Sequence, residues 1–195
     1  MQVFKCFSRL FPALALASAL GLTAPPAPAW DWTWGAKVSG SGNIKTEARS
    51  VSGFTGISLS LPAKVDIVQG GIEGISIETD DNVLPLIETV VEDGKLKIRF
   101  KERNMSVSTK TLKMTVNVKS LDSLAVAGSG DLRAAKLQVA KLKTSIAGSG
   151  DVRIAALDAD SLTVSIAGSG DFSAGGKVNT DIARAGNAGF QLCHL

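Results

Sequence analysis

The sequence predicts an all-β protein whose main part is a right-handed parallel β-helix, a solenoid with coils of about 20 residues, preceded by an irregular β portion. The pentapeptide Ala-Gly-Ser-Gly-Asp occurs at residues 127–131, 147–151 and 167–171, so both intervals are 20 residues. Equivalent positions between the copies stay apolar, with polar residues between them. No copy shows the apolar period of an amphipathic helix.

Residues 121–185 form the predicted solenoid. A period of 20 residues accommodates two short strands and two turns, and stacked coils bring equivalent apolar residues about 4.8 Å apart into a continuous core. Glycine permits the sharp corner that each coil needs. An antiparallel meander of hairpins is the alternative arrangement. The aligned apolar columns are Leu132, Val152 and Phe172; Leu137 and Leu157; and Leu142, Leu162 and Ile182.

Residues 44–120 are the irregular β portion. Asp93-Gly94 is a hairpin signal, and Asp81-Asn82 can cap a short helical turn at 83–87. The strand-like runs are 56–61, 63–68, 72–78, 95–100 and 113–118.

Residues 1–29 have the features of a secretion signal. Lys5 and Arg9 precede an apolar stretch at 10–22, which is shorter than the roughly 20 residues that span a bilayer. Cleavage before Trp30 would leave a mature chain without a transmembrane segment. We therefore expect export to the periplasm, the outer surface or the medium.

The charge of the mature chain argues against nucleic-acid binding. Removal of residues 1–29 takes away two of 21 basic residues and no acidic ones, leaving 19 against 18 and a net charge of +1. No basic cluster is present, so the electrostatic footprint of a nucleic-acid-binding protein is missing. The mature chain keeps a single cysteine, Cys193, which excludes an intramolecular disulfide.

A longer pattern resembles a known family. The run Val-Ser-Gly-Phe-Thr-Gly-Ile-Ser-Leu-Ser-Leu-Pro-Ala-Lys-Val-Asp-Ile-Val-Gln-Gly at 51–70 is followed by Ile-Glu-Thr-Asp-Asp-Asn-Val-Leu-Pro-Leu at 77–86 and then by the three pentapeptides. This order is similar to the "putative autotransporter adhesin head GIN" family over about residues 38–180. The resemblance implies an exported bacterial protein with a right-handed β-helix-like fold and no established reaction.

Asp131, Asp151 and Asp171 are candidate metal ligands, since stacked coils would align their carboxylates, and calcium prefers oxygen ligands. The alternative is that each carboxylate accepts hydrogen bonds from backbone N–H groups of its own glycine corner. No other cofactor is expected.

Trp30, Trp32 and Trp34 lie in the N-terminal segment at 30–43 and are candidate ligand-binding residues. Their alternation places the three rings on one side of an extended segment, where they could stack on a sugar ring or on a partner. The same arrangement suits a flap over the apolar end of the first coil.

An enzyme is not expected. The single histidine, His194, lies in the atypical segment 186–195, which leaves no credible nucleophile–histidine pair. Asp131, Arg133, Asp151 and Arg153 fall in adjacent columns, but alternating charge on a solvated face explains them equally well.

The sequence therefore predicts a non-enzymatic envelope protein. It would be an adhesin-like module binding a glycan or a protein, a structural component without a soluble ligand, or, as the least favoured alternative, a carbohydrate-active enzyme. Segment 186–195 does not form a polar cap and suggests a truncated or frameshifted end, so we also expect self-association through an uncapped edge.

Overall fold

The computed structural model describes residues 37–102, 104–185 and 190–194, with side chains described for residues 37–102, 104–179 and 191. The chain divides into two compact units, Met1–Thr33 and Trp34–Leu195, and all described residues belong to the second. The predicted secretion signal and the three tryptophans fall outside them. Among the described residues, no helix is both long and apolar enough to cross a membrane.

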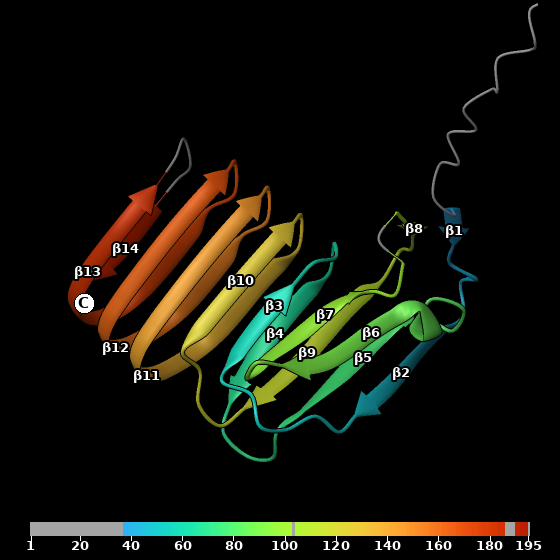
Figure 1. Ribbon diagram of the computed structural model, residues 1–195, viewed down its shortest axis with the longest axis horizontal. Helices are drawn as coiled ribbons and strands as arrows, with labels where there is room; N and C mark the ends of the chain where they lie inside the picture. The colour runs from blue at the N-terminus through green and yellow to red at the C-terminus, as the bar shows by residue number, and fades with distance from the viewer. Residues whose placement is uncertain (1–36, 103, 186–189, 195) are drawn as a thin grey trace, which may run out of the picture. The chain divides into compact units, whose positions relative to one another are not determined.

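The described part of the chain is built from strands and one 3₁₀ turn (Figure 1). Its elements are β1 Lys37–Ser39, β2 Ile44–Arg49, β3 Gly56–Leu59, β4 Lys64–Gln69, β5 Gly74–Asp80, η1 Leu84–Leu86, β6 Ile87–Glu92, β7 Lys95–Phe100, β8 Ser106–Ser108, β9 Leu112–Val118, β10 Ser123–Gly128, β11 Asp131–Gly148, β12 Val152–Gly168, β13 Phe172–Ala185 and β14 Phe190–His194.

The predicted right-handed parallel β-helix is wrong as a description of the fold. The main sheet is mixed and curls into a half-barrel. Its order is β2-β5-β9-β4-β11-β10-β3-β7-β6, and the pairs β2–β5, β5–β9 and β6–β7 are antiparallel. One cause is local: Asp93 and Gly94 both have positive φ, so the chain reverses in a tight hairpin between β6 and β7.

The strands after β10 pair in parallel with the 20-residue offset seen in the sequence. β11 and β12 are each continuous strands that run through both walls of the half-barrel. They replace the two short strands per coil that the sequence suggested, and they also exclude the antiparallel meander for this region. Leu132 pairs with Val152, which pairs with Phe172, and all three are buried.

One predicted column is displaced. The register between β12 and β13 shifts between Ile154 and Leu157, so Leu162 pairs with Asp181 and not with Ile182. As a result Ala183, rather than Arg184, pairs with Val164. Between these two positions β13 has one residue fewer than β12, and the shorter segment falls at Gly175-Gly176, where Gly176 has a φ of 127°.

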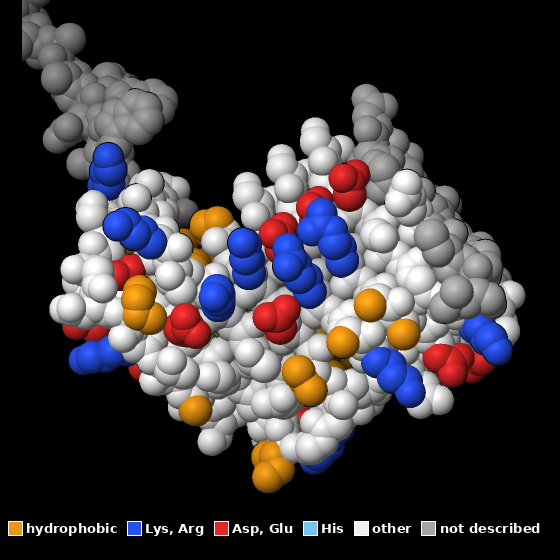
Figure 2. All heavy atoms as spheres, turned by 180° about the vertical axis from the view of Figure 1, so that it is seen from behind, with side chains coloured by type: hydrophobic (Ala, Val, Ile, Leu, Met, Phe, Trp, Pro, Cys, Tyr) orange, Lys and Arg blue, Asp and Glu red, His pale blue; other side chains and the backbone are white. Residues whose placement is uncertain are grey.

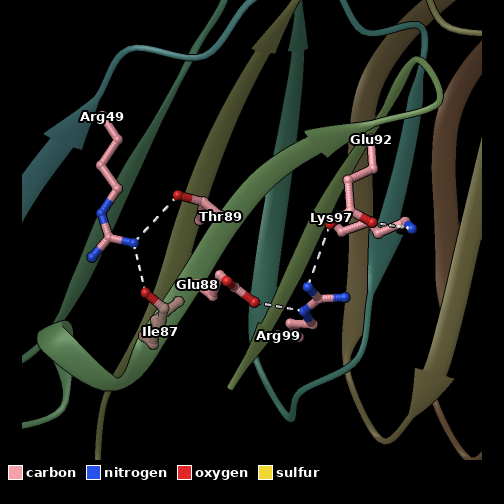
Figure 3. Close-up of polar contacts among 7 residues, drawn as sticks. All are labelled: Arg49, Ile87, Glu88, Thr89, Glu92, Lys97 and Arg99. Carbon is pink, nitrogen blue, oxygen red and sulfur yellow. Dashed lines mark hydrogen bonds and ion pairs between the residues drawn. The ribbon is translucent and has the colours of Figure 1, made fainter. Parts of the chain in front are cut away.

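Arg49 joins the two ends of the curled sheet (Figure 3). It lies at the end of β2, while its Nη1 donates to the carbonyl oxygen of Ile87 in β6 at 2.8 Å and its Nη2 to that of Leu84 at 3.0 Å. Its Nε donates to Glu47 at 2.6 Å. β2 and β6 are the two ends of the sheet order. The Arg49 guanidinium therefore links the two edges of the curled sheet through its hydrogen bonds.

The glycine corners have no room for side chains. A Cβ on Gly150 would collide with the carbonyl oxygen of Gly130, and one on Gly170 with that of Gly150. Gly148 also has a φ of 122°, a conformation that other residues rarely adopt. These glycines therefore allow successive layers to approach to the spacing of a parallel sheet.

Gly150→Ala should lower the free energy of unfolding by about 3 kcal/mol, because two backbone layers must separate to admit the methyl group. Urea unfolding followed by circular dichroism measures this. Ser149→Ala, at the exposed neighbouring position, is the matched control and should change stability by less than about 0.5 kcal/mol. Equal effects of the two changes would contradict the packing argument.

Thr144 is an uncompensated polar group in the core. It pairs with Leu124 and Val164 in neighbouring strands, is completely buried, and its hydroxyl has no hydrogen-bond partner in the described part of the chain. Burial of an unsatisfied hydroxyl costs free energy.

Thr144→Val should therefore raise the free energy of unfolding by about 1 kcal/mol, since a methyl group replaces the hydroxyl among apolar neighbours. The control is Thr163→Val, at a half-exposed position of the outer face, which should change the free energy of unfolding by less than about 0.5 kcal/mol. A destabilised Thr144→Val variant would show that the hydroxyl has a partner.

Candidate functional site

The predicted aspartates lie at the starts of successive strands. The carboxylate of Asp151 accepts the backbone N–H of Asp171 at 3.0 Å and Nη2 of Arg153 at 2.7 Å. It therefore bonds to the next layer and to a neighbouring cation rather than to its own glycine corner. Across residues 37–194 as far as they are described, no group of three acidic, histidine or cysteine side chains gathers at one point. A calcium role for Asp131, Asp151 and Asp171 stays a prediction.

The remaining predicted positions give less information. Trp30, Trp32 and Trp34 precede the described residues, so their ligand-binding role stays a prediction. Cys193 and His194 contribute backbone to β14, but their side chains are not among those described.

The outer face of β4, β9, β11 and β12 carries a dense pattern of charge. Lys64 of β4 is the register partner of Lys113 in β9, and Arg133 of β11 is the partner of Arg153 in β12. Asp66 lies beside Arg133. All five side chains are exposed. Figure 2 shows this face, with Lys and Arg side chains gathered across its middle and acidic side chains beside them.

A groove of about 390 Å³ opens on the Lys64 and Lys113 side of this face. Among the described residues that line it, three are lysines and none is acidic. Its lining residues are Pro62, Lys64, Phe100, Val107, Ser108, Thr109, Lys110, Thr111, Leu112 and Lys113. Figure 2 shows a hollow at the upper edge of the face, with apolar side chains on its floor. We call it the lysine groove.

A buried carboxylate fixes one wall of the lysine groove. Asp80 is 2% exposed; its Oδ1 accepts the backbone N–H of Gly42 at 2.6 Å, and its Oδ2 accepts the hydroxyl of Thr109. The backbone N–H of Gly40 donates to Ser108 O at 2.8 Å, which continues the pairing of β1 with β8. This arrangement, the polar latch, holds residues 108–111 in place.

Hydrogen bonds beside the latch anchor the segment before β2. The Ser41 hydroxyl donates to Asp81 Oδ1 at 2.5 Å, and Asn82 Nδ2 donates to Ser39 O at 2.8 Å. The Ser41 hydrogen bond is the main cause that lowers the pKa of Asp81 below its usual value, with a smaller contribution from Lys45. Both effects favour the ionised carboxylate.

Two cations of the β6–β7 hairpin, Lys97 and Arg99, are neutralised within the chain (Figure 3). Arg99 contacts Glu88 at 2.6 Å, and Lys97 contacts Glu92 at 2.5 Å. The Glu88 hydrogen bond raises the pKa of Arg99, and the Lys97 hydrogen bond lowers the pKa of Glu92. By contrast, Lys64, Lys110 and Lys113 take part in no ion pair or side-chain hydrogen bond with another described residue.

Sequence reasoning missed the lysine groove. Its lining comes from β4, the end of β7 and the segment from β8 to β9, which lie up to about 50 residues apart in the sequence. Lys64 is the first residue of the alternating strand β4 and Lys113 the second residue of the alternating strand β9, and this was the available signal. Their meeting depends on the pairing of β4 with β9, which no local pattern specifies.

Comparisons with known proteins agree with this fold. A family model described as "putative auto-transporter adhesin, head GIN domain" matches residues 53–191. A "putative adhesin" from Parabacteroides distasonis is similar in structure, with a TM-score of 0.54, 18% identity, and coverage of 81% of this chain and 82% of that one. A "putative adhesin" from Bacteroides fragilis has a TM-score of 0.52, 16% identity and coverage of 81% and 100%.

A second Parabacteroides distasonis structure, described as a "putative lipid binding protein", has a TM-score of 0.51, 17% identity and coverage of 80% of this chain and 99% of its own. No curated protein matches the chain. At such identities the likeness concerns the fold and leaves the ligand open.

Thermal stability should fall as the pH drops below 4.5 and further below 3.8, the ordinary pKa values of glutamate and aspartate. The pKa values of Glu92 and Asp81 are lowered in the folded state, so the unfolded chain takes up protons first. The stability that these groups supply above the ordinary values is then lost as the pH falls toward the lowered ones. Melts from about pH 7 to about pH 3 test this, and Glu92→Gln should reduce the dependence. A thermal midpoint that stays constant over this pH range would contradict the prediction.

Proposed function

The chain belongs to the family described as "putative auto-transporter adhesin, head GIN domain", and on this premise we propose that it is a non-enzymatic, adhesin-like binding module of the cell envelope. The outer face of β4, β9, β11 and β12 holds the partner, and the partner is an acidic glycan. Export by the secretion signal at residues 1–29 brings the module to the envelope.

The observation that carries the proposal is the juxtaposition of like charges on this face. Lys64 next to Lys113, and Arg133 next to Arg153, are direct neighbours in a parallel register. Like charges on neighbouring strands cost roughly 0.2–1 kcal/mol per pair. Only Arg153 of the four has an ion-pair partner among the described residues. A partner that supplies anions would relieve this repulsion.

Catalysis is a weaker candidate. Asp151 is engaged by Arg153 at 2.7 Å, which leaves it a poor nucleophile or base. The two carboxyls with shifted pKa values, Asp81 and Glu92, both shift downward, and a general acid needs the opposite shift.

A lipid held between the walls of the half-barrel is also less well supported, because the chain's own side chains fill the interior. Leu59 and Ile98 are completely buried there, and Leu124 and Ile146 are 1% exposed. A purely structural envelope role is less well supported, because it would leave the charge pattern of the outer face without a purpose.

The purified protein should bind an immobilised acidic polysaccharide such as polygalacturonate, bind a neutral galactan far more weakly, and lose affinity as salt rises. Arg133→Gln with Arg153→Gln should weaken binding about tenfold, which corresponds to about 1.4 kcal/mol. Biolayer interferometry measures the dissociation constants.

The matched control is Lys141→Gln with Lys143→Gln, which removes the same charge from exposed positions at and just before the part of β11 that pairs with β10, away from the segment 131–134 that pairs with β4. This control should change affinity by less than about twofold. Salt-independent binding, equal binding of the neutral polymer, or an equal loss in the control would refute a role for the charged face.

A further inference from the structure

The lysine groove combines features of a ligand subsite that neither the fold nor the core requires. We propose that it binds one acidic sugar unit of an anionic glycan, with the sugar carboxylate between Lys64, Lys110 and Lys113. This inference rests on the proposed glycan-binding function and adds the site and the chemical class of the bound unit.

The first argument is charge. Glu78 and Asp131 are the nearest acidic neighbours in the register, opposite Lys113 and Lys64 respectively, yet neither forms an ion pair with its lysine. Lys97 and Arg99 of the β6–β7 hairpin, by contrast, are held by glutamates. The ammonium groups of the groove are exposed and remain available to an external anion.

The second argument is the rest of the lining. Phe100 and Val107 are partly buried against the core and present apolar surface to the groove. An aromatic ring suits the C–H face of a sugar. Ser108 and Thr111 add hydroxyls at the same wall. The volume of about 390 Å³ lies within the range of small-ligand sites, roughly 300–1,000 Å³.

The third argument is rigidity. Lys110 lies between Thr109, which donates to the buried Asp80, and Thr111, whose carbonyl oxygen accepts the hydroxyl of Thr79 at 2.7 Å. The backbone on both sides of Lys110 is therefore fixed before any ligand arrives, which lowers the entropy cost of binding. Lys110 also borders a second hollow of about 420 Å³ on the other side of the segment, so a longer polymer can continue past it.

The apolar surface argues for a sugar and against a lipid headgroup at a membrane. Among the described residues, four large apolar side chains are exposed; none of them lines the lysine groove, and of the four Ile44 alone lines the second hollow. They are Ile44, Val68, Ile72 and Val91. A membrane-facing site needs exposed apolar side chains around the headgroup, whereas a sugar needs the hydroxyls and the partly buried ring that are present.

The test is titration calorimetry of the purified protein with trigalacturonic acid. Lys64→Gln, Lys110→Gln and Lys113→Gln together should weaken binding at least about thirtyfold, and Lys110→Gln alone about fivefold. The matched triple variant Lys95→Gln, Lys141→Gln and Lys143→Gln has the same net charge and should lose less than about twofold in affinity. Circular dichroism melts verify that both triple variants remain folded.

Neutral galactotriose should not bind, and inorganic phosphate at equal concentration should not displace the acidic trisaccharide. Equal losses in the two triple variants would overturn the groove as the site, and so would equal binding of galactotriose. Displacement by phosphate, or binding of phosphatidylglycerol vesicles without trisaccharide binding, would overturn the sugar as the ligand.

The groove and the general function fail in different ways. If polygalacturonate binding persists in the groove triple variant but is lost with Arg133→Gln and Arg153→Gln, the module function stands and the groove inference falls. If the unaltered protein binds no acidic polysaccharide, the proposed function itself is wrong.

Discussion

Close contact between glycine corners of successive strands is the constraint on which the register of the parallel strands depends, and with it the core and the outer charges of that region. Gly150 has a backbone carbonyl directly beneath it and no space for a Cβ. Successive layers can therefore approach to the spacing of a parallel sheet, about 4.8 Å. At that spacing β11 and β12 run in register, which places Leu132 beside Val152 in the interior and Arg133 beside Arg153 outside. A single backbone requirement thus determines both the continuity of the core in this region and the repulsive pair of Arg133 and Arg153 on the outer face.

The earlier part of the chain follows a different principle. Its antiparallel pairs include the hairpin of β6 and β7 and also join strands that are not consecutive, β2 with β5 and β5 with β9. Its sheet closes around the core when the guanidinium of Arg49 reaches the carbonyl oxygens of Leu84 and Ile87. This mixed region inserts β4 between β9 and β11. Lys64 consequently lies between Lys113 on one side and the charged start of β11 on the other. The lysine groove is therefore formed where the irregular and the regular parts of the sheet meet.

The sequence was informative where a physical requirement recurs locally. Glycine blocks at 20-residue intervals predicted the parallel register of β11 and β12, and Asp93-Gly94 predicted the hairpin of β6 and β7. The fold class was wrong because parallel pairing in one region does not determine the pairing of strands such as β2, β5 and β9, which are separated in the sequence by other strands and share no repeating pattern. The shift near Gly176 depends on a single missing residue, and the lysine groove depends on contacts between distant segments.

Lysine and arginine have two distinct roles on this molecule. Lys97 and Arg99 are bound by glutamates of the same hairpin, whereas Lys64 and Lys110 are left without a counterion. Exposed ion pairs contribute little to folding, typically about 0–1 kcal/mol. The fold therefore loses almost nothing when such lysines remain unpaired, because its stability comes from the core and the glycine corners. For the same reason, substitutions of the charged residues around the groove can change the partner without loss of the fold. This independence of the site from the scaffold allows one fold to serve binding modules of different specificity.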